Sequence, residues 1–307
     1  MASDGNGGSE GLTLEAALEG KRGAGSAPPA DPAELAKLAE WTTLMQARGS
    51  TVSDELPAFP GTATKLLSML EAGDPEPRAL VEVIQTDAPV AAQVLKLANS
   101  AAFTRGVEIT TVQLAATRLG VRTVTAVALA ASTKALLDQQ ERQILQAFRE
   151  RWRALSDTSL RVATAARALS KKVNRGNADE AFLAGLMVDL GKAVGLRLVG
   201  TLVQEGELPA TISTAAVEQL LERTHVEFGV DLTAVWDLPG FINHVCAHHH
   251  DPTAAAVPVN DVLHVVRVAA MLDALQTNPY TGVEVVSQLR CSAEALGLVE
   301  PRLRMAG

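Results

Sequence analysis

The stretch GLMVDLGK, at residues 185–192, places a single carboxylate, Asp189, inside an otherwise apolar sequence. Asn177, followed three residues later by Glu180, forms a capping-box pattern and predicts that a helix opens just before this stretch. A carboxylate on an apolar helix needs polar partners, because burying an unpaired charge is costly. We therefore expect Asp189 to be buried or half-buried and hydrogen-bonded to neighbouring helices.

The composition and the helix signals around this stretch predict an all-α fold. Alanine, leucine and valine are abundant, whereas aromatic residues make up only 3% of the 307 residues, which suits close-packed helices better than sheets. From Leu56 onward, helix-start and helix-stop patterns follow one another with no convincing strand between them. Asp87 precedes one expected helix, and Thr110 or Thr111 starts another. In the second half of the chain, the expected helices are residues 141–173, 214–224, 226–236, 241–250 and 260–275.

The chain divides into four expected parts. The first 30 residues are rich in Gly, Ser, Ala and Pro and predict a disordered arm, weakly helical at most around Leu12–Leu18. Order is expected from Asp31, which precedes Pro32 in a helix-start pattern, and the helix that begins there is expected to end near Arg48-Gly49. The parts are an arm (1–30), an N-terminal helix and linker (31–55), a domain of two packed helical lobes (56–251, with lobes at about 56–137 and 141–251) and a C-terminal helical extension (252–307).

Charge and cysteine content limit the function classes. The net charge of −8 makes nucleic-acid binding an unlikely general property, and no apolar stretch is long enough for a membrane span. The N-terminus lacks a basic stretch followed by an apolar run, so no signal peptide is expected. The two cysteines, Cys246 and Cys291, are too few for a disulfide framework. We expect a cytoplasmic protein.

Five local patterns, in order along the chain, resemble those of the HDOD domains, which are HD-related output domains of bacterial signalling proteins. They cover roughly Leu56 to Asp251 and predict an HD-like bundle of helices. The patterns are LPAFP at 56–60 with KLL at 65–67, DAPVAAQVLKLANSA at 87–101, the stretch from Ile109 to Gly120, GLMVDLGK at 185–192, and WDLP at 236–239 followed by His248-His249.

The resemblance also indicates that the metal-binding motif is degenerate. GLMVDLGK is similar to the GLLHDIGK signature of HD-type metal phosphohydrolases, with Val188 in place of a histidine ligand. Thr158 and Ala270 stand where two further ligands would be expected. The remnant consists of Asp189, His248 and His249, and a single carboxylate holds a divalent metal too weakly for hydrolysis. We therefore predict no catalytic residue, no bound metal and no cofactor.

Other residues have competing interpretations. His244, His248 and Asp251 recur at helical spacing and could chelate zinc with a further ligand, but packing and helix termination account for them more simply. His248, like Thr158, is also a candidate partner for Asp189. We predict structural roles for three residues: Asn99, Trp236 and Pro239.

A basic face on the expected helix 141–173 and just beyond it is the best candidate for a binding surface. Its predicted contact residues are Arg153, Arg161, Lys171 and Arg175. Arginine pairs well with carboxylates and phosphates, so an acidic protein surface is the expected partner. A solvated helix face is the alternative interpretation.

The sequence thus favours a non-catalytic regulatory module of bacterial signal transduction that binds another protein. The resemblance implies this role. One alternative is a divergent metal-dependent phosphodiesterase that uses Asp189, His248, His249 and a further ligand. Another is a sensor that binds a nucleotide between its two lobes.

Overall fold

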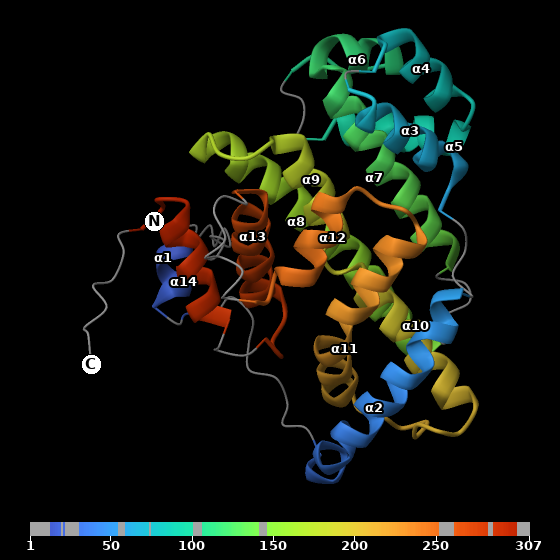
Figure 1. Cartoon of the computed structure of the whole chain (residues 1–307), viewed down its shortest axis with the longest axis vertical. Helices are drawn as coiled ribbons and strands as arrows, with labels where there is room; N and C mark the ends of the chain where they lie inside the picture. The colour runs from blue at the N-terminus through green and yellow to red at the C-terminus, as the bar shows by residue number, and fades with distance from the viewer. Residues whose placement is uncertain are drawn as a thin grey trace, which may run out of the picture.

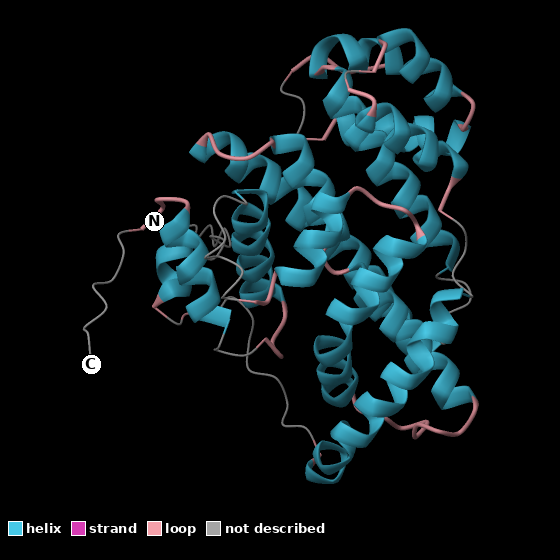
Figure 2. Cartoon of the chain, in the orientation of Figure 1, coloured by secondary structure: helices cyan, strands magenta, loops and turns pink. Residues whose placement is uncertain are grey.

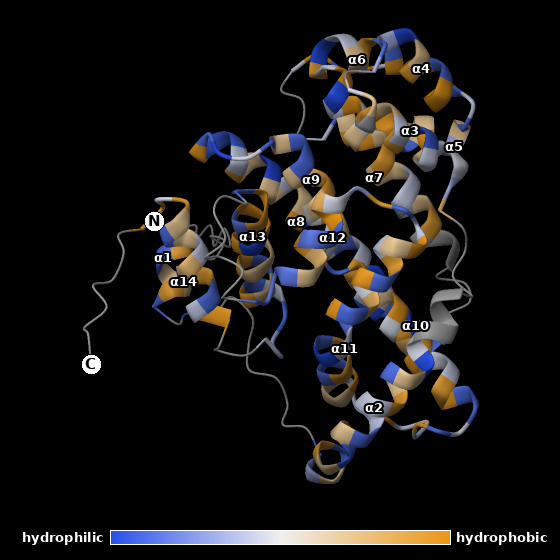
Figure 3. Cartoon of the chain, in the orientation of Figure 1, coloured by the Kyte–Doolittle hydropathy of each residue, from blue (hydrophilic) through white to orange (hydrophobic). Residues whose placement is uncertain are grey.

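The computed structural model describes residues 13–19, 21, 31–54, 59–73, 75–100, 106–140, 146–251, 261–281 and 285–299. Throughout these ranges the regular structure is helical and contains no strand (Figure 2). The predicted all-α class is therefore confirmed. Apolar and polar residues alternate around most helices, as expected for helices that bury one side (Figure 3).

The first lobe gathers five helices at the top of Figure 1. They are α3 (Gly61–Glu71), α4 (Pro77–Gln85), α5 (Ala88–Ala98), α6 (Val112–Leu119) and α7 (Val121–Gln140). Asp87 caps α5 by accepting a hydrogen bond from the Val90 amide, and Thr111 caps α6 in the same way through Leu114. Both helix starts agree with the sequence prediction.

The second lobe holds the stretch GLMVDLGK, with Asp189, between long, packed helices. Its elements are α8 (Arg149–Val173), preceded by the 3₁₀ turn η2 (Gln146–Phe148), α9 (Ala178–Met187), α10 (Leu190–Gln204), α11 (Thr214–Val235) and α12 (Gly240–His248). Asn177 accepts hydrogen bonds from the Asp179 and Glu180 amides and so caps α9. One apolar core, which includes α7 and α9, runs through both lobes and joins them.

Helix α2 (Pro32–Asp54) packs against α10 and α11 of the second lobe. It continues past Arg48-Gly49, where its end was expected. A Cβ on Gly49 would lie 2.2 Å from the Phe228 ring, so glycine allows α2 to approach α11 closely. Of the expected N-terminal helix and linker at residues 31–55, only residue 55 lies outside the described residues.

The C-terminal extension builds a second apolar cluster on α8 and α9. Helix α13 (Asp261–Thr277) packs on both, and α14 (Val285–Ala295) packs on α13. The short helix α1 (Leu14–Leu18) joins this cluster through the fully buried Ala17. Helix α1 falls within Leu12–Leu18, the part of the arm expected to be weakly helical, and its apolar side is covered by α13 and α14 (Figure 1).

The three residues predicted to be structural lie at helix junctions. Asn99 donates hydrogen bonds to the Leu95 and Ile109 carbonyls and accepts one from the Ile109 amide, which ties the end of α5 to the segment before α6. Trp236 ends α11 and its ring lies 4.8 Å from that of Phe59, the start of the first lobe. Pro239 immediately precedes α12.

Candidate functional site

A close helix crossing brings the residues around Asp189 against α11. A Cβ on Gly191 would lie 1.9 Å from the His225 carbonyl oxygen, so the backbones of α10 and α11 touch at this point. Only glycine allows that approach. Asp189, immediately before α10, and Lys192, in its first turn, thereby face Glu222 and His225 on α11.

The Lys192 ammonium lies between two carboxylates. Its Nζ is 3.2 Å from Asp189 Oδ1 and 2.9 Å from Glu222 Oε1. Burial is the largest single influence and acts to raise the pKa of both acids, but the Lys192 ammonium together with the nearby histidines holds each pKa below its ordinary value. Burial likewise opposes the charge of Lys192, and the two carboxylates raise its pKa above the ordinary value. The expectation that Asp189 is buried with polar partners holds, although its suggested partners Thr158 and His248 are wrong.

Three histidines complete the cluster beside Asp189. His225 on α11 and His249, directly after α12, approach each other with their Nε2 atoms 3.1 Å apart. His250 stands next to both, with ring centroids 5.0 Å from His225 and 4.2 Å from His249. One ring nitrogen from each of the three lies within 4.8 Å of the others. Asp189 Oδ1 is 3.7 Å and 3.9 Å from the Nε2 atoms of His225 and His249. We call His225, His249, His250 and Asp189 the histidine cluster.

Backbone contacts fix the tautomers of two rings. The Nδ1 of His225 is 3.0 Å from the Leu221 carbonyl, and the Nδ1 of His249 is 2.9 Å from the Cys246 carbonyl. A carbonyl oxygen only accepts, so each Nδ1 carries the hydrogen. In the neutral rings, the two Nε2 atoms therefore present lone pairs.

Burial keeps these rings neutral. Removal from water, together with the nearby Lys192 ammonium, lowers the pKa of His225 to about 4. The pKa values of His249 and His250 are also lowered, chiefly by burial. Neutral imidazoles beside a carboxylate are the donors that zinc and similar transition metals bind, so the residues present fit such an ion.

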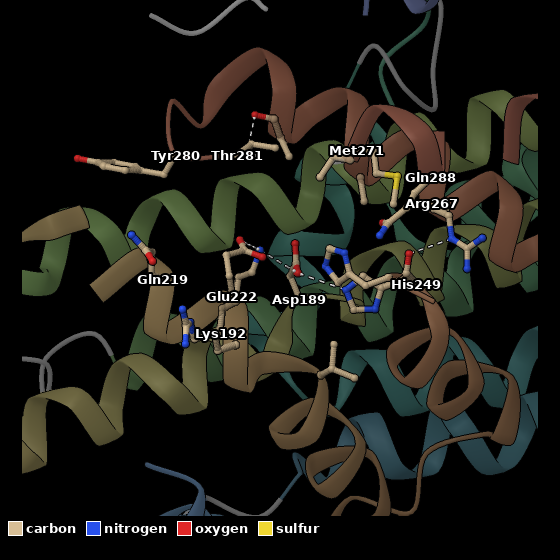
Figure 4. Close-up of a pocket in the computed structure, with 16 residues that line it drawn as sticks. Asp189, Lys192, Gln219, Glu222, His249, Arg267, Met271, Tyr280, Thr281 and Gln288 are labelled. Carbon is tan, nitrogen blue, oxygen red and sulfur yellow. Dashed lines mark hydrogen bonds and ion pairs between the residues drawn. The ribbon is translucent and has the colours of Figure 1, made fainter. Parts of the chain in front are cut away.

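The C-terminal extension closes one side of the cluster. Asp189, Lys192, Glu222 and His249 line a pocket of about 490 Å³, and the opposite wall comes from α13, α14 and the segment between them (Figure 4). Arg267 on α13 is fully buried and donates hydrogen bonds to the carbonyls of His248, His249 and Asp251. It thereby holds the end of α12, and with it His249 and His250, in place.

Several sequence predictions for this site need correction. The remnant was predicted as Asp189, His248 and His249, but His248 lies outside the cluster, with its Nδ1 3.8 Å from the Asp251 carboxylate and its ring tilted against that of His244. Consecutive residues at a helix end point in different directions, which separates His248 from His249. The sequence analysis missed His225 and His250. The Val188 side chain, by contrast, is buried in the apolar cluster shared with α13 and offers no ligand.

The predicted basic face is partly neutralised within the chain. Arg161 pairs with Asp273 of α13 at 2.7 Å. Arg175 lies 3.5 Å from Asp261 and donates to the Ala295 carbonyl. Those two arginines therefore fasten the C-terminal extension to α8, whereas Arg153 and Lys171 are exposed on α8.

A groove of about 970 Å³ lies between α8 and α13. Lys171 and Lys172 line it together with Leu169 and Leu272. Burial, followed by the nearby Arg167, lowers the pKa of Lys171 below its ordinary value. The groove thus combines concentrated positive charge with apolar walls.

The cavity at the junction of the two lobes, lined by residues such as Leu97, Ala130 and Leu186, holds only about 10 Å³. That is room for one water molecule, whereas ligand pockets typically occupy about 300–1,000 Å³. This cavity is therefore too small to hold a nucleotide.

The fold and the degenerate GLMVDLGK stretch define the class of this protein as an HD-related helical signalling domain. The family model of the HDOD domain matches residues 56–252, which is more than half of the chain. The chain belongs to the HDOD domain family. Among curated proteins, the sequence has no significant match.

Three solved structures share the fold. A protein from Shewanella amazonensis SB2B, provisionally named a metal-dependent phosphohydrolase, is 20% identical with a TM-score of 0.63, and the match covers 85% of this chain and 99% of that one. An HDOD domain protein of unknown function from Geobacter sulfurreducens is 22% identical with a TM-score of 0.58, covering 81% and 94%. A provisionally named signal transduction protein from Marinobacter aquaeolei VT8 is 19% identical with a TM-score of 0.51, covering 93% and 64%.

Among the helices in the described ranges, none combines the length and apolar character needed to cross a membrane.

Proposed function

We propose that this HDOD protein is a non-catalytic regulatory module that acts by binding another protein. The observation that carries this proposal is the Lys192 ammonium bound between Asp189 and Glu222. Hydrolysis of a phosphodiester needs a free base or a metal with an open position for water. Here the carboxylates of Asp189 and Glu222 are both paired with the single Lys192 ammonium rather than left free as bases, and Val188 supplies no ligand.

The family supports a role in signalling. The sequence motifs resemble those of HD-related output domains of bacterial signalling proteins, and the chain belongs to the HDOD family. One structural neighbour also carries the name of a signal transduction protein. A regulator without chemistry of its own has to present a surface that a partner recognises. The groove between α8 and α13 offers exposed lysines beside apolar side chains, which suits an acidic helix or loop of a partner.

The structure changes which residues should be tested on this surface. Four residues were proposed for binding: Arg153, Arg161, Lys171 and Arg175. Of these, Arg161 holds α13 and Arg175 holds α14. Reversing their charge would disturb the fold as well as the surface. Lys171 and the adjacent Lys172 are exposed and line the groove, so they report on binding more cleanly.

The test is quantitative crosslinking and mass spectrometry from the native cell, with wild-type protein and the double variant Lys171→Glu/Lys172→Glu. A Lys65→Glu/Lys96→Glu variant, which reverses two charges in the first lobe, serves as the matched control. We expect proteins that are captured by the wild type and the control but lost by the groove variant. An identical capture profile for all three would contradict the proposal that this groove is the binding surface.

A further inference from the structure

The contact between His225 and His249 cannot be an ordinary hydrogen bond. Both Nδ1 atoms donate to backbone carbonyls, so neither Nε2 of the neutral pair carries a hydrogen. The two Nε2 atoms nevertheless face each other at 3.1 Å. Two lone pairs at that separation repel unless a cation lies between them.

The separation matches that of two ligands on one metal ion. Zinc–imidazole bonds of 2.0–2.1 Å in tetrahedral geometry place the two nitrogens about 3.3 Å apart. Asp189 Oδ1, at 3.7 Å and 3.9 Å from the same nitrogens, lies within about half an ångström of the position of a third ligand. His250 is half-buried, and one of its ring nitrogens lies within 4.8 Å of the other two, so a rotation of its side chain would be needed to bring this fourth donor to the same centre.

A proton is the alternative occupant of this gap. Asp189 and Glu222 together carry two negative charges against the single Lys192 ammonium, so charge alone admits either a proton or a metal ion. The geometry favours the metal ion, because a proton joins only His225 and His249, whereas a metal ion also accounts for Asp189 and His250 beside the same two nitrogens.

We propose that His225, His249, His250 and Asp189 bind one divalent transition-metal ion, with zinc as the preferred occupant. Four protein ligands fill a tetrahedral shell and leave no position for a water nucleophile, which makes the centre a structural clamp rather than a hydrolytic one. The clamp joins α10, α11 and the end of α12. Through the Arg267 hydrogen bonds to the His248 and His249 carbonyls, it also connects to α13.

The clamp would therefore couple metal binding to the placement of the C-terminal extension. This inference goes beyond the proposed protein-binding function and does not depend on it, because the ligands lie in the cluster and the lysines of the groove do not. Metal binding and partner capture can fail separately.

The experiment uses untagged full-length protein that has been treated with a chelator and dialysed. A zinc titration measured by isothermal calorimetry should show one equivalent of zinc bound per chain. The melting temperature should rise when zinc is added. Cobalt substitution should give the visible absorption of a tetrahedral site. The variant His249→Gln, which keeps a polar amide in the ring's place, should lower zinc affinity at least tenfold and abolish that absorption; loss of even an outer partner costs about 10–100-fold.

The exposed pair provides the control. His244 and His248 also stand four residues apart with ring centroids 4.6 Å from each other, but they lie outside the cluster. We expect His244→Gln/His248→Gln to bind zinc and cobalt like the wild type. Circular dichroism and the melting temperature of each metal-free variant establish that it is folded. His225→Gln is a second cluster variant in case His249→Gln does not fold.

Absence of stoichiometric binding to the wild type would overturn the proposal. So would a site that survives in both folded cluster variants but disappears with His244→Gln/His248→Gln, because the metal would then be held on the surface.

Discussion

The chain carries two groups of histidines that lie close together near α12 but differ in their surroundings. His244 and His248 share a partly exposed face of α12, where His248 has 39% of its side chain in water. His225, His249 and His250 lie beside Asp189, and the first two are almost completely buried. The exposed pair has the regular spacing of a chelating helix, whereas the buried group is assembled from two distant segments.

The difference shows that helical spacing alone does not identify a ligand site. The buried rings have fixed tautomers, because backbone carbonyls accept from Nδ1, and they have a carboxylate within 4 Å. Of these two features, the exposed pair has only a carboxylate nearby, Asp251, which is itself 40% exposed. Fixed donors next to a buried acid are the physical signature of a site.

The largest effect is expected from Lys192→Met. Methionine retains the apolar stem but leaves Asp189 and Glu222 without their cation, and breaking a buried pair in this way costs about 3–5 kcal/mol. Urea unfolding of metal-free protein measures the loss. If the cluster attracts cations, zinc should recover more stability in this variant than in the wild type. Equal recovery would indicate that Lys192 and the cluster are uncoupled.

A somewhat smaller loss is expected from Gly191→Ala. The added methyl group would meet the His225 carbonyl and force α10 away from α11, and such overpacking costs about 1–3 kcal/mol, here at the upper end. The matched control is Gly240→Ala at the start of α12, where a Cβ meets no atom within 4 Å. Thermal melting of both variants should show a loss for the first only. A stable Gly191→Ala protein would place the helices farther apart than described here.

Asn99→Ala tests a buried polar junction that contains no histidine. Three hydrogen bonds join Asn99 to the Leu95 and Ile109 backbone, and leaving these groups unpaired costs about 1–3 kcal/mol. We expect a lower melting temperature with unchanged zinc affinity. A change in affinity would mean that the two lobes transmit strain to the cluster.

The smallest effect is expected from His244→Gln/His248→Gln. Substitutions on an exposed helix face usually change stability by less than about 0.5 kcal/mol. Urea unfolding should therefore hardly distinguish this variant from the wild type. A loss comparable to that of Gly191→Ala would show that the exposed pair is structurally important.

Much of the fold was predictable because its signals are local. The caps Asp87, Thr111 and Asn177 begin helices where they were expected, and the all-α class follows from the apolar periodicity. The end of α2 was placed too early at Gly49, because glycine ends many helices. In this case the residue is needed for the contact with Phe228.

The candidate site was only half predictable. Asp189 was identified from its own stretch, but His225 was missed because helices were predicted at 214–224 and 226–236, with a break at that residue. The structure has one continuous helix, α11, so Glu222 and His225 share a face one turn apart. The three-residue spacing of Glu222 and His225 was the sequence signal that could have placed both side chains on one helix face. The approach of His225 to His249 depends on the crossing of α10 and α11, which no local pattern specifies.

The central claim is that the histidine cluster is a closed, non-hydrolytic centre. The most direct measurement is the turnover of a phosphodiester, such as a cyclic dinucleotide, by full-length protein loaded with zinc or manganese, compared with Asp189→Ala protein. The account predicts no turnover above that of buffer containing the same metal for either protein. Turnover by the wild type that disappears in folded Asp189→Ala protein would contradict it.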